Sequence, residues 1–249
     1  MLRPLGGSRL KIERANQHID NLNGILEAFT KADFYSLGVQ KDLMGHYVLK
    51  FEVTKSLPNI APTVGDAVHN LRASLDLAAC EIVRIGGGTP NRNTKFPFRK
   101  DRKELVNAIN GGTIKTAGAD IVDFIVDTVK PYKGGNDALI GLHYIDIMDK
   151  HVNMIPVLSV YELVNVNGRM GNCIISNSTF AVRGGGVVDT ISMTEKVEFE
   201  GHGEPRFRIL FGKGKVFEGQ PIIPTLHQLS HLVSGILDAI EKIILSRPI

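Results

Sequence analysis

One group of ionisable residues, His69, Arg72 and Asp76, has the spacing of a helix face. Separations of three and four residues place an imidazole, a guanidinium and a carboxylate within one or two turns of each other. Such a group can orient a phosphate through the guanidinium, or supply an acid and a base for proton transfer. The alternative is a solvated helix face on which Arg72 and Asp76 form an ion pair between neighbouring turns.

A second group follows about seventy residues later, at His143, Asp146 and Lys150, with His151 beside it. The spacings of three and seven residues put the first three on one side of a helix. Leu, Ile and Met residues occupy several sides of the same segment, so part of this helix should be buried. Buried charges need partners, and we therefore expect these side chains to be paired.

Three interpretations of the second group remain open. It could be a catalytic or ligand-binding cluster. His143 and Asp146 could share a divalent metal, with His69 or Asp76 as a third ligand from another helix. The group could also be structural, with an Asp146–Lys150 ion pair and a hydrogen bond from His143 to a neighbouring helix. No Cys-x-x-Cys or His-Glu-x-x-His pattern is present, so we assign no metal ligand, and the sequence identifies no cofactor.

Two such groups together suggest a shared site. We expect them to face each other across a cleft, with Lys133 and Asn136 of the segment 131–136 near its mouth. On this hypothesis the six residues of the two groups carry the chemistry, and Lys133, Asn136 and His151 bind the ligand.

The segment 91–103 contains six basic residues and one acidic residue, with Phe96 and Phe98 between them. Basic and aromatic side chains in alternation can pair with phosphates and stack on bases. RNA or a nucleotide is therefore a possible partner of this loop. Alternatively, the Phe-Pro-Phe sequence anchors the loop in the core and the basic side chains are only hydrated.

Several short blocks follow one another in a characteristic order: Gly65-Asp-Ala-Val-His-Asn-Leu-Arg-Ala-Ser-Leu-Asp76, Gly87-Gly-Thr-Pro90, Phe96-Pro-Phe98, Pro131-Tyr-Lys-Gly-Gly-Asn136 and Leu142-His-x-x-Asp-x-x-Asp-Lys-His151. They resemble a family of uncharacterised bacterial proteins, and the resemblance covers about residues 8–160. In that family the helix of the first block usually reads Asn-Leu-Arg-Ser-Ala-Leu-Asp-His. Its Arg-x4-His spacing is similar to the motif of HEPN-type ribonucleases.

The chain departs from that motif, because Arg72 is present but Leu77 stands at the position of the histidine. The resemblance implies a protein associated with nucleic acid or nucleotides. Arg72 would then contact phosphate, and His69 or His143 would transfer protons in place of the missing histidine. Two other classes of function stay open: a metal-assisted hydrolase using His143, Asp146 and His69, and a non-catalytic scaffold. The scaffold would self-associate into a homo-oligomer through apolar helices such as 225–245.

The elements that must position these residues follow from the spacing of apolar side chains. Apolar positions recur at three and four residues in the helical segments and alternate in the strand 46–54, which follows a turn at 42–45. Thr63 is expected to cap the second helix. The fold class is α+β, in one domain. The domain consists of a helical region of about 1–152, a β-rich region of about 153–220 and a helix of about 225–246. The β-rich region is expected to be an antiparallel meander. The expected helices of the first region are 8–31, 64–85, 101–110, 118–129 and 137–151.

Composition excludes several classes of protein. Hydrophobic residues make up 43% of the 249 positions and charged residues 22%, which excludes a disordered chain. The net charge of +3 is too small to indicate nucleic-acid binding without a local patch. No apolar run reaches the roughly 18 residues of a membrane span, and the first twenty residues lack the apolar core of a signal peptide. We therefore expect a cytoplasmic protein that does not bind membranes.

Two weaker signals concern single side chains. Cys80 and Cys173 lie in apolar runs and are expected to be buried free thiols. His227 and His231 have a spacing that can bind a metal, but without an acidic or Cys neighbour they are expected on a polar helix face.

Overall fold

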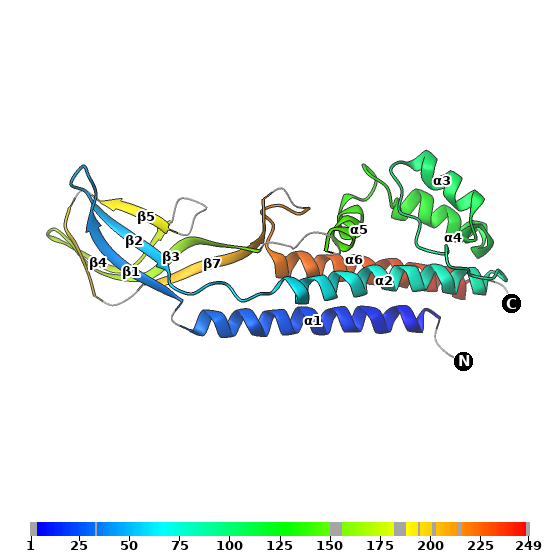
Figure 1. Ribbon diagram of the computed structural model, residues 1–249, viewed down its shortest axis with the longest axis horizontal. Helices are drawn as coiled ribbons and strands as arrows, with labels where there is room; N and C mark the ends of the chain where they lie inside the picture. The colour runs from blue at the N-terminus through cyan, green and yellow to red at the C-terminus, as the bar shows by residue number, and fades with distance from the viewer. Residues whose placement is uncertain are drawn as a thin grey trace.

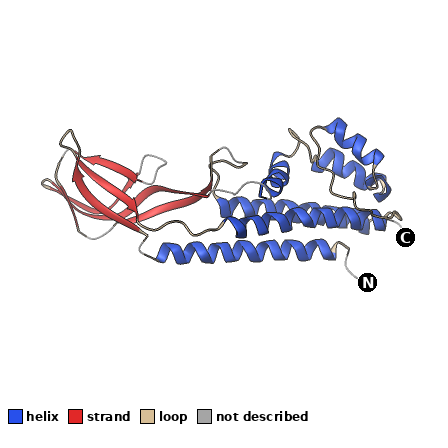
Figure 2. Cartoon of the chain, viewed as in Figure 1, coloured by secondary structure: helices blue, strands red, loops and turns tan. Residues whose placement is uncertain are grey.

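A computed structural model describes residues 4–32, 34–149, 156–181, 188–193, 195–200, 203–213 and 216–247. The molecule is elongated, with helices at one end and strands at the other (Figures 1 and 2). Helices and antiparallel strands are thus segregated along the long axis, and the chain is α+β as predicted.

Three long helices run side by side along the helical part: α1 (Gly6–Lys31), α2 (Ala61–Ile85) and α6 (Ile222–Leu245) (Figure 1). Each carries an apolar stripe at the three- and four-residue spacing of one helix face, and these stripes face one another. Packing of the stripes, rather than intrinsic helix propensity, is the main source of stability for such helices.

Helix α2 begins earlier than the sequence suggested. The helix starts at Ala61 with a proline in its first turn, and no side chain caps it. Thr63 therefore lies within the first turn, and the prediction that it caps the helix is wrong. A proline fits the first turn because its fixed φ matches the helix and its missing N–H would have no intrahelical partner.

Shorter helices cover one end and one side of this bundle. They are α3 (Arg102–Gly111), the 3₁₀ turn η1 (Ile114–Ala117), α4 (Ala119–Asp123), the π-helical turn η2 (Phe124–Val129) and α5 (Asp137–Asp149). Helix α5 packs against both α2 and α6, and it brings the second polar group to the bundle.

The strands form two antiparallel sheets. In the first, β1 (Tyr35–Lys41), β2 (Tyr47–Val53) and β5 (Val188–Met193) lie in the order β1-β2-β5. The β1–β2 turn is held by Asp42, whose carboxylate accepts hydrogen bonds from the Met44 and His46 amides. The pairing of β5 with the hairpin, instead of with a sequence neighbour, was not anticipated.

The second sheet is built on the long strand β3 (Pro156–Met170). Strand β4 (Cys173–Ala181) pairs along one edge of β3, and β6 (Val197–Phe199) and β7 (Glu204–Phe211) also pair with β3. Strand β7 ends against the helices, so this sheet is joined to the bundle by packing as well as by the chain.

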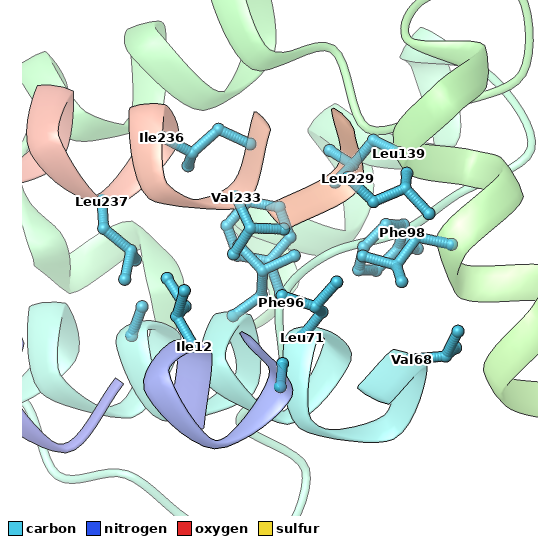
Figure 3. Packing of buried hydrophobic residues seen from close by; sticks show 14 of the residues in the cluster. Ile12, Val68, Leu71, Phe96, Phe98, Leu139, Leu229, Val233, Ile236 and Leu237 are labelled. Carbon is cyan, nitrogen blue, oxygen red and sulfur yellow. The ribbon is translucent and has the colours of Figure 1, made fainter. Parts of the chain in front are cut away.

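One hydrophobic core runs through the helical part. Leu71 of α2, Phe98 of the loop before α3 and Val233 of α6 all belong to it (Figure 3). Ile209 and Phe211 of β7 extend it to the sheet. A fully buried Leu or Phe contributes about 1.5–3 kcal/mol, so this cluster is the largest favourable contribution to folding.

Among the described residues, no helix has the length and apolarity needed to cross a bilayer. Cys80 and Cys173 are free thiols, as predicted, but the expectation that both are buried is wrong. Cys80 is half-buried, and Cys173 is exposed because it opens β4 directly after the β3–β4 turn.

Candidate functional site

The two polar groups meet where α5 packs on α2. His69 Nδ1 lies 2.9 Å from Asp146 Oδ1, and Arg72 Nε donates to His143 Nδ1 at 3.3 Å. His69 and Arg72 are three residues apart on α2, and His143 and Asp146 are three residues apart on α5. The two hydrogen-bonded pairs therefore lie one helical turn apart. The partners run in opposite order along the two helices, which are therefore antiparallel at this contact.

His69 and Asp146 differ sharply in exposure. The His69 side chain is 54% exposed, whereas that of Asp146 is 10% exposed. An ionised carboxylate only accepts hydrogen bonds, so Asp146 favours the His69 tautomer with its proton on Nδ1. The Nε2 atom then keeps its lone pair. This is the arrangement in which a buried carboxylate orients an imidazole for proton transfer.

Arg72 is held from several sides. Its Nη1 lies 2.5 Å from Asp76 Oδ1, and its guanidinium carbon lies 4.3 Å from the centre of the Phe98 ring. The expected ion pair between neighbouring turns is thus present, but Arg72 is buried, so only part of this side of α2, including His69, is exposed to solvent. A guanidinium held in this way supports His143 instead of reaching toward solvent.

His143 is half-buried between Arg72 and Phe98. Its ring stacks on Phe98 with 4.5 Å between centres and 8° between planes. Burial lowers the pKa of His143 below its usual value, and the Arg72 charge lowers it further, while Asp146 and Asp76 oppose the shift. A neutral ring is consistent with its Nδ1 atom accepting from Arg72.

The basic loop is tied to this cluster through its backbone and aromatic residues. The Phe96 amide donates to Asp76 Oδ1 at 2.8 Å, and both Phe96 and Phe98 are buried. The Phe-Pro-Phe sequence is therefore a core anchor, and its rings do not face solvent for base stacking. Arg99 Nη1 donates to the Phe98 carbonyl at 2.6 Å, which places this exposed arginine beside the residue whose ring stacks on His143. The six basic side chains of the loop are all exposed: Arg92, Lys95, Arg99, Lys100, Arg102 and Lys103.

No protein family, curated protein or solved structure matches the chain.

The ligand-binding residues predicted from the PYKGGN segment do not join the cluster in any contact of the described residues. Lys133 is exposed. Asn136 caps α5, because its side-chain oxygen accepts from the Leu139 amide at 3.0 Å, and it lines a separate cavity. Lys150 and His151 lie outside the described residues, so the Asp146–Lys150 pair stays a prediction.

The metal interpretation lacks a ligand set within the described part of the chain. There, no group of three or more His, Cys, Asp or Glu side chains could hold a metal ion. His227 and His231 are exposed on α6, consistent with a polar face. Leu77, at the position of the HEPN-type histidine, is 37% exposed on α2.

Sequence reasoning missed two features of the site. It treated Arg72 as the phosphate ligand, whereas Arg99 is the exposed arginine near the cluster. It also offered no pairing between the groups, although the matching three-residue spacings of 69/72 and 143/146 were a usable signal. When two antiparallel helices each carry two polar residues at the same spacing, each residue of one helix can bond to a residue of the other.

Proposed function

We propose that the protein binds RNA, or a nucleotide, and that His69 transfers protons at a phosphodiester held by the basic loop. The observation that carries this proposal is the exposed His69 imidazole bonded to the buried Asp146 carboxylate. Proton transfer by a positioned imidazole needs a fixed tautomer and a free ring nitrogen at the surface, and this pair supplies both. The α2 segment also resembles the Arg-x4-His motif of HEPN-type ribonucleases in part, with Arg72 present and Leu77 at the histidine position, and this partial resemblance points to the same substrate class.

The chemistry follows from the charges of the site. His69 Nε2 takes the proton of a ribose 2′-hydroxyl, and the 2′-oxygen forms a bond to phosphorus. The bond from phosphorus to the 5′-oxygen breaks, and that oxygen takes a proton from water. The His69 imidazolium then returns its proton to solvent, leaving a cyclic phosphate and a 5′-hydroxyl. Asp146 stabilises the imidazolium that forms in the first step.

The phosphate contact belongs to the basic loop in this proposal. Arg99 is exposed and its Nη1 atom donates to the carbonyl of Phe98, the residue that stacks on His143, and five further basic side chains lie in the same segment. One guanidinium group can donate two parallel hydrogen bonds to two oxygens of the same phosphate, and this geometry makes arginine a frequent phosphate ligand. Arg72 acts indirectly, since it fixes His143 and the Phe98 ring beneath the site.

A mixed pool of single-stranded RNA tests the proposal. The purified full chain should retain the RNA at low salt and cleave it, and the cleavage rate should fall at least a hundredfold in His69→Gln. His227→Gln is the matched control, because this histidine is also exposed but lies on α6. The proposal is contradicted if the chain neither binds nor cleaves the pool, or if both variants cleave as fast as the unaltered protein.

A further inference from the structure

A cavity of about 640 Å³ lies between the start of α5, the chain before α6 and the first turns of α6. Its volume is in the usual range of small-molecule sites, about 300–1,000 Å³. It shares no lining residue with the His69 cluster, and its interpretation does not rest on the proposed function. Phe217 and Leu232 give its lining apolar surface, and Gln220 and Gln228 give it carboxamide groups. Asp137 is the one charged residue among the described residues of the lining, and its carboxylate accepts from the Gly134 amide at 3.0 Å.

Phe217 lines this cavity in a backbone conformation that is unfavourable for a phenylalanine. Its φ is +62°, in the left-handed region. Residues other than glycine, asparagine and aspartate rarely adopt it, at a cost of about 1–3 kcal/mol. The conformation is held by hydrogen bonds around it: the Gln220 amide donates to the Phe217 carbonyl at 2.9 Å, and the Gly219 amide donates to the Phe211 carbonyl at 3.0 Å.

A glycine in α5, which lowers the stability of that helix, also makes room for the Phe217 ring. Gly141 lies inside α5, where glycine costs about 0.5–1 kcal/mol relative to alanine. A Cβ atom at this position would lie 2.4 Å from Cζ of Phe217, so only glycine lets the ring lie against the helix. An unfavourable backbone angle and a helix glycine thus converge on one result, which is the position of the Phe217 ring beside the cavity.

We infer that this cavity binds an uncharged nucleobase or nucleoside. The Phe217 ring and Leu232 offer apolar contact to a planar heteroaromatic ring. The carboxamides of Gln220 and Gln228 each carry both donors and acceptors, the combination that pairs with the edge of a base. Thr225, which also lines the cavity, donates its hydroxyl to the Pro221 carbonyl at 2.7 Å and lies 3.4 Å from the Gln220 side-chain oxygen. The main specificity groups are therefore the Gln228 carboxamide and the side-chain nitrogen of Gln220.

Adenosine is the probe, measured on the full chain by saturation-transfer NMR and titration calorimetry. Gln228 is exposed, so Gln228→Trp should fill the cavity without disturbing the fold. His231→Trp is the matched control: it places the same ring on an exposed position of α6 that does not line the cavity. Thermal unfolding of both variants checks that each is folded. Ribose, which has no aromatic ring, is the ligand control.

The expected result is adenosine binding to the unaltered chain and to His231→Trp with equal affinity, weakened at least tenfold in Gln228→Trp, and no saturation transfer to ribose. The inference is overturned by no binding of adenosine at millimolar concentration, by equal binding to the two tryptophan variants, or by equal signals from ribose and adenosine. Adenosine binding that is lost in His69→Gln but kept in Gln228→Trp would assign it to the other site and also overturn the inference.

Discussion

Asp146 lies 77 residues from His69 in the chain, yet the two side chains are in contact at 2.9 Å, the carboxylate buried and the imidazole at the surface. One turn along the same helix contact, Arg72 and His143 form a second pair, in which Arg72 is buried and His143 is half-buried. The two pairs divide the cluster into a part open to a substrate and a part that supports it. This division underlies the predictions about the site.

The supporting part should make stability depend on pH. The pKa of His143 is lower in the folded state than the usual histidine value of 6.5. As the pH falls through 6.5, the unfolded chain therefore binds a proton more readily at this residue than the folded chain does. The stabilisation from a neutral His143 is therefore complete above pH 6.5 and is lost below it. Chemical denaturation between pH 7.5 and 5 should show a smaller loss of unfolding free energy in His143→Gln than in the unaltered chain. Equal pH dependence in the two proteins would rule out this role.

The open part should bind phosphate through Arg99. Arg99→Gln should weaken RNA binding and lower the slope of log affinity against log salt by about 1, the value for one lost phosphate contact. Arg14→Gln on α1 is the control, since Arg14 is also exposed and its partner is Gln17. Fluorescence anisotropy at several salt concentrations gives both slopes. If the two variants have the same slope, Arg99 does not contact phosphate.

Substitution of Leu77 tests whether the histidine position of the HEPN-type motif is the active one. A histidine at this position would lie on the exposed side of α2, one residue beyond Asp76, and would not replace His69. Leu77→His should therefore leave the RNA cleavage rate unchanged within about twofold. A tenfold or greater increase would show that the family's histidine position is the active one, and the assignment to His69 would have to be abandoned.

The core that carries the site should be sensitive to cavities. Leu71 is fully buried on α2, and Leu71→Ala should cost about 2–5 kcal/mol of unfolding free energy. Leu10 on α1 is 64% exposed, and Leu10→Ala should cost less than about 1 kcal/mol. Urea denaturation of both variants measures the difference. Equal losses would contradict the packing described for the bundle.

The spacing of apolar residues predicted the long helices, because it reports directly which side of a helix meets the core. It did not predict that Arg72 is buried, since a helix wheel has no information about a second helix and a loop covering its polar side. The pairing of β5 with β2 was also out of reach, because alternation of side chains shows that a strand exists but not which strand is its neighbour.

The cavity beside Phe217 shows a different limit of prediction from the sequence. A glycine within an apolar helical segment was visible at Gly141, and such a glycine often marks a close approach. The sequence does not reveal which residue approaches, because Phe217 lies 76 positions later in an irregular segment. Contacts of this kind depend on where the loop before α6 crosses α5.

The central claim is that Asp146 fixes His69 for proton transfer, and the single-turnover cleavage rate of RNA by Asp146→Asn tests it most directly. This substitution keeps the size of the side chain but allows an amide N–H to face His69 Nδ1, which favours the wrong tautomer. The rate should fall at least a hundredfold, while RNA affinity stays within about threefold. A rate equal to that of the unaltered protein, in a variant that is folded and binds RNA normally, would contradict the claim.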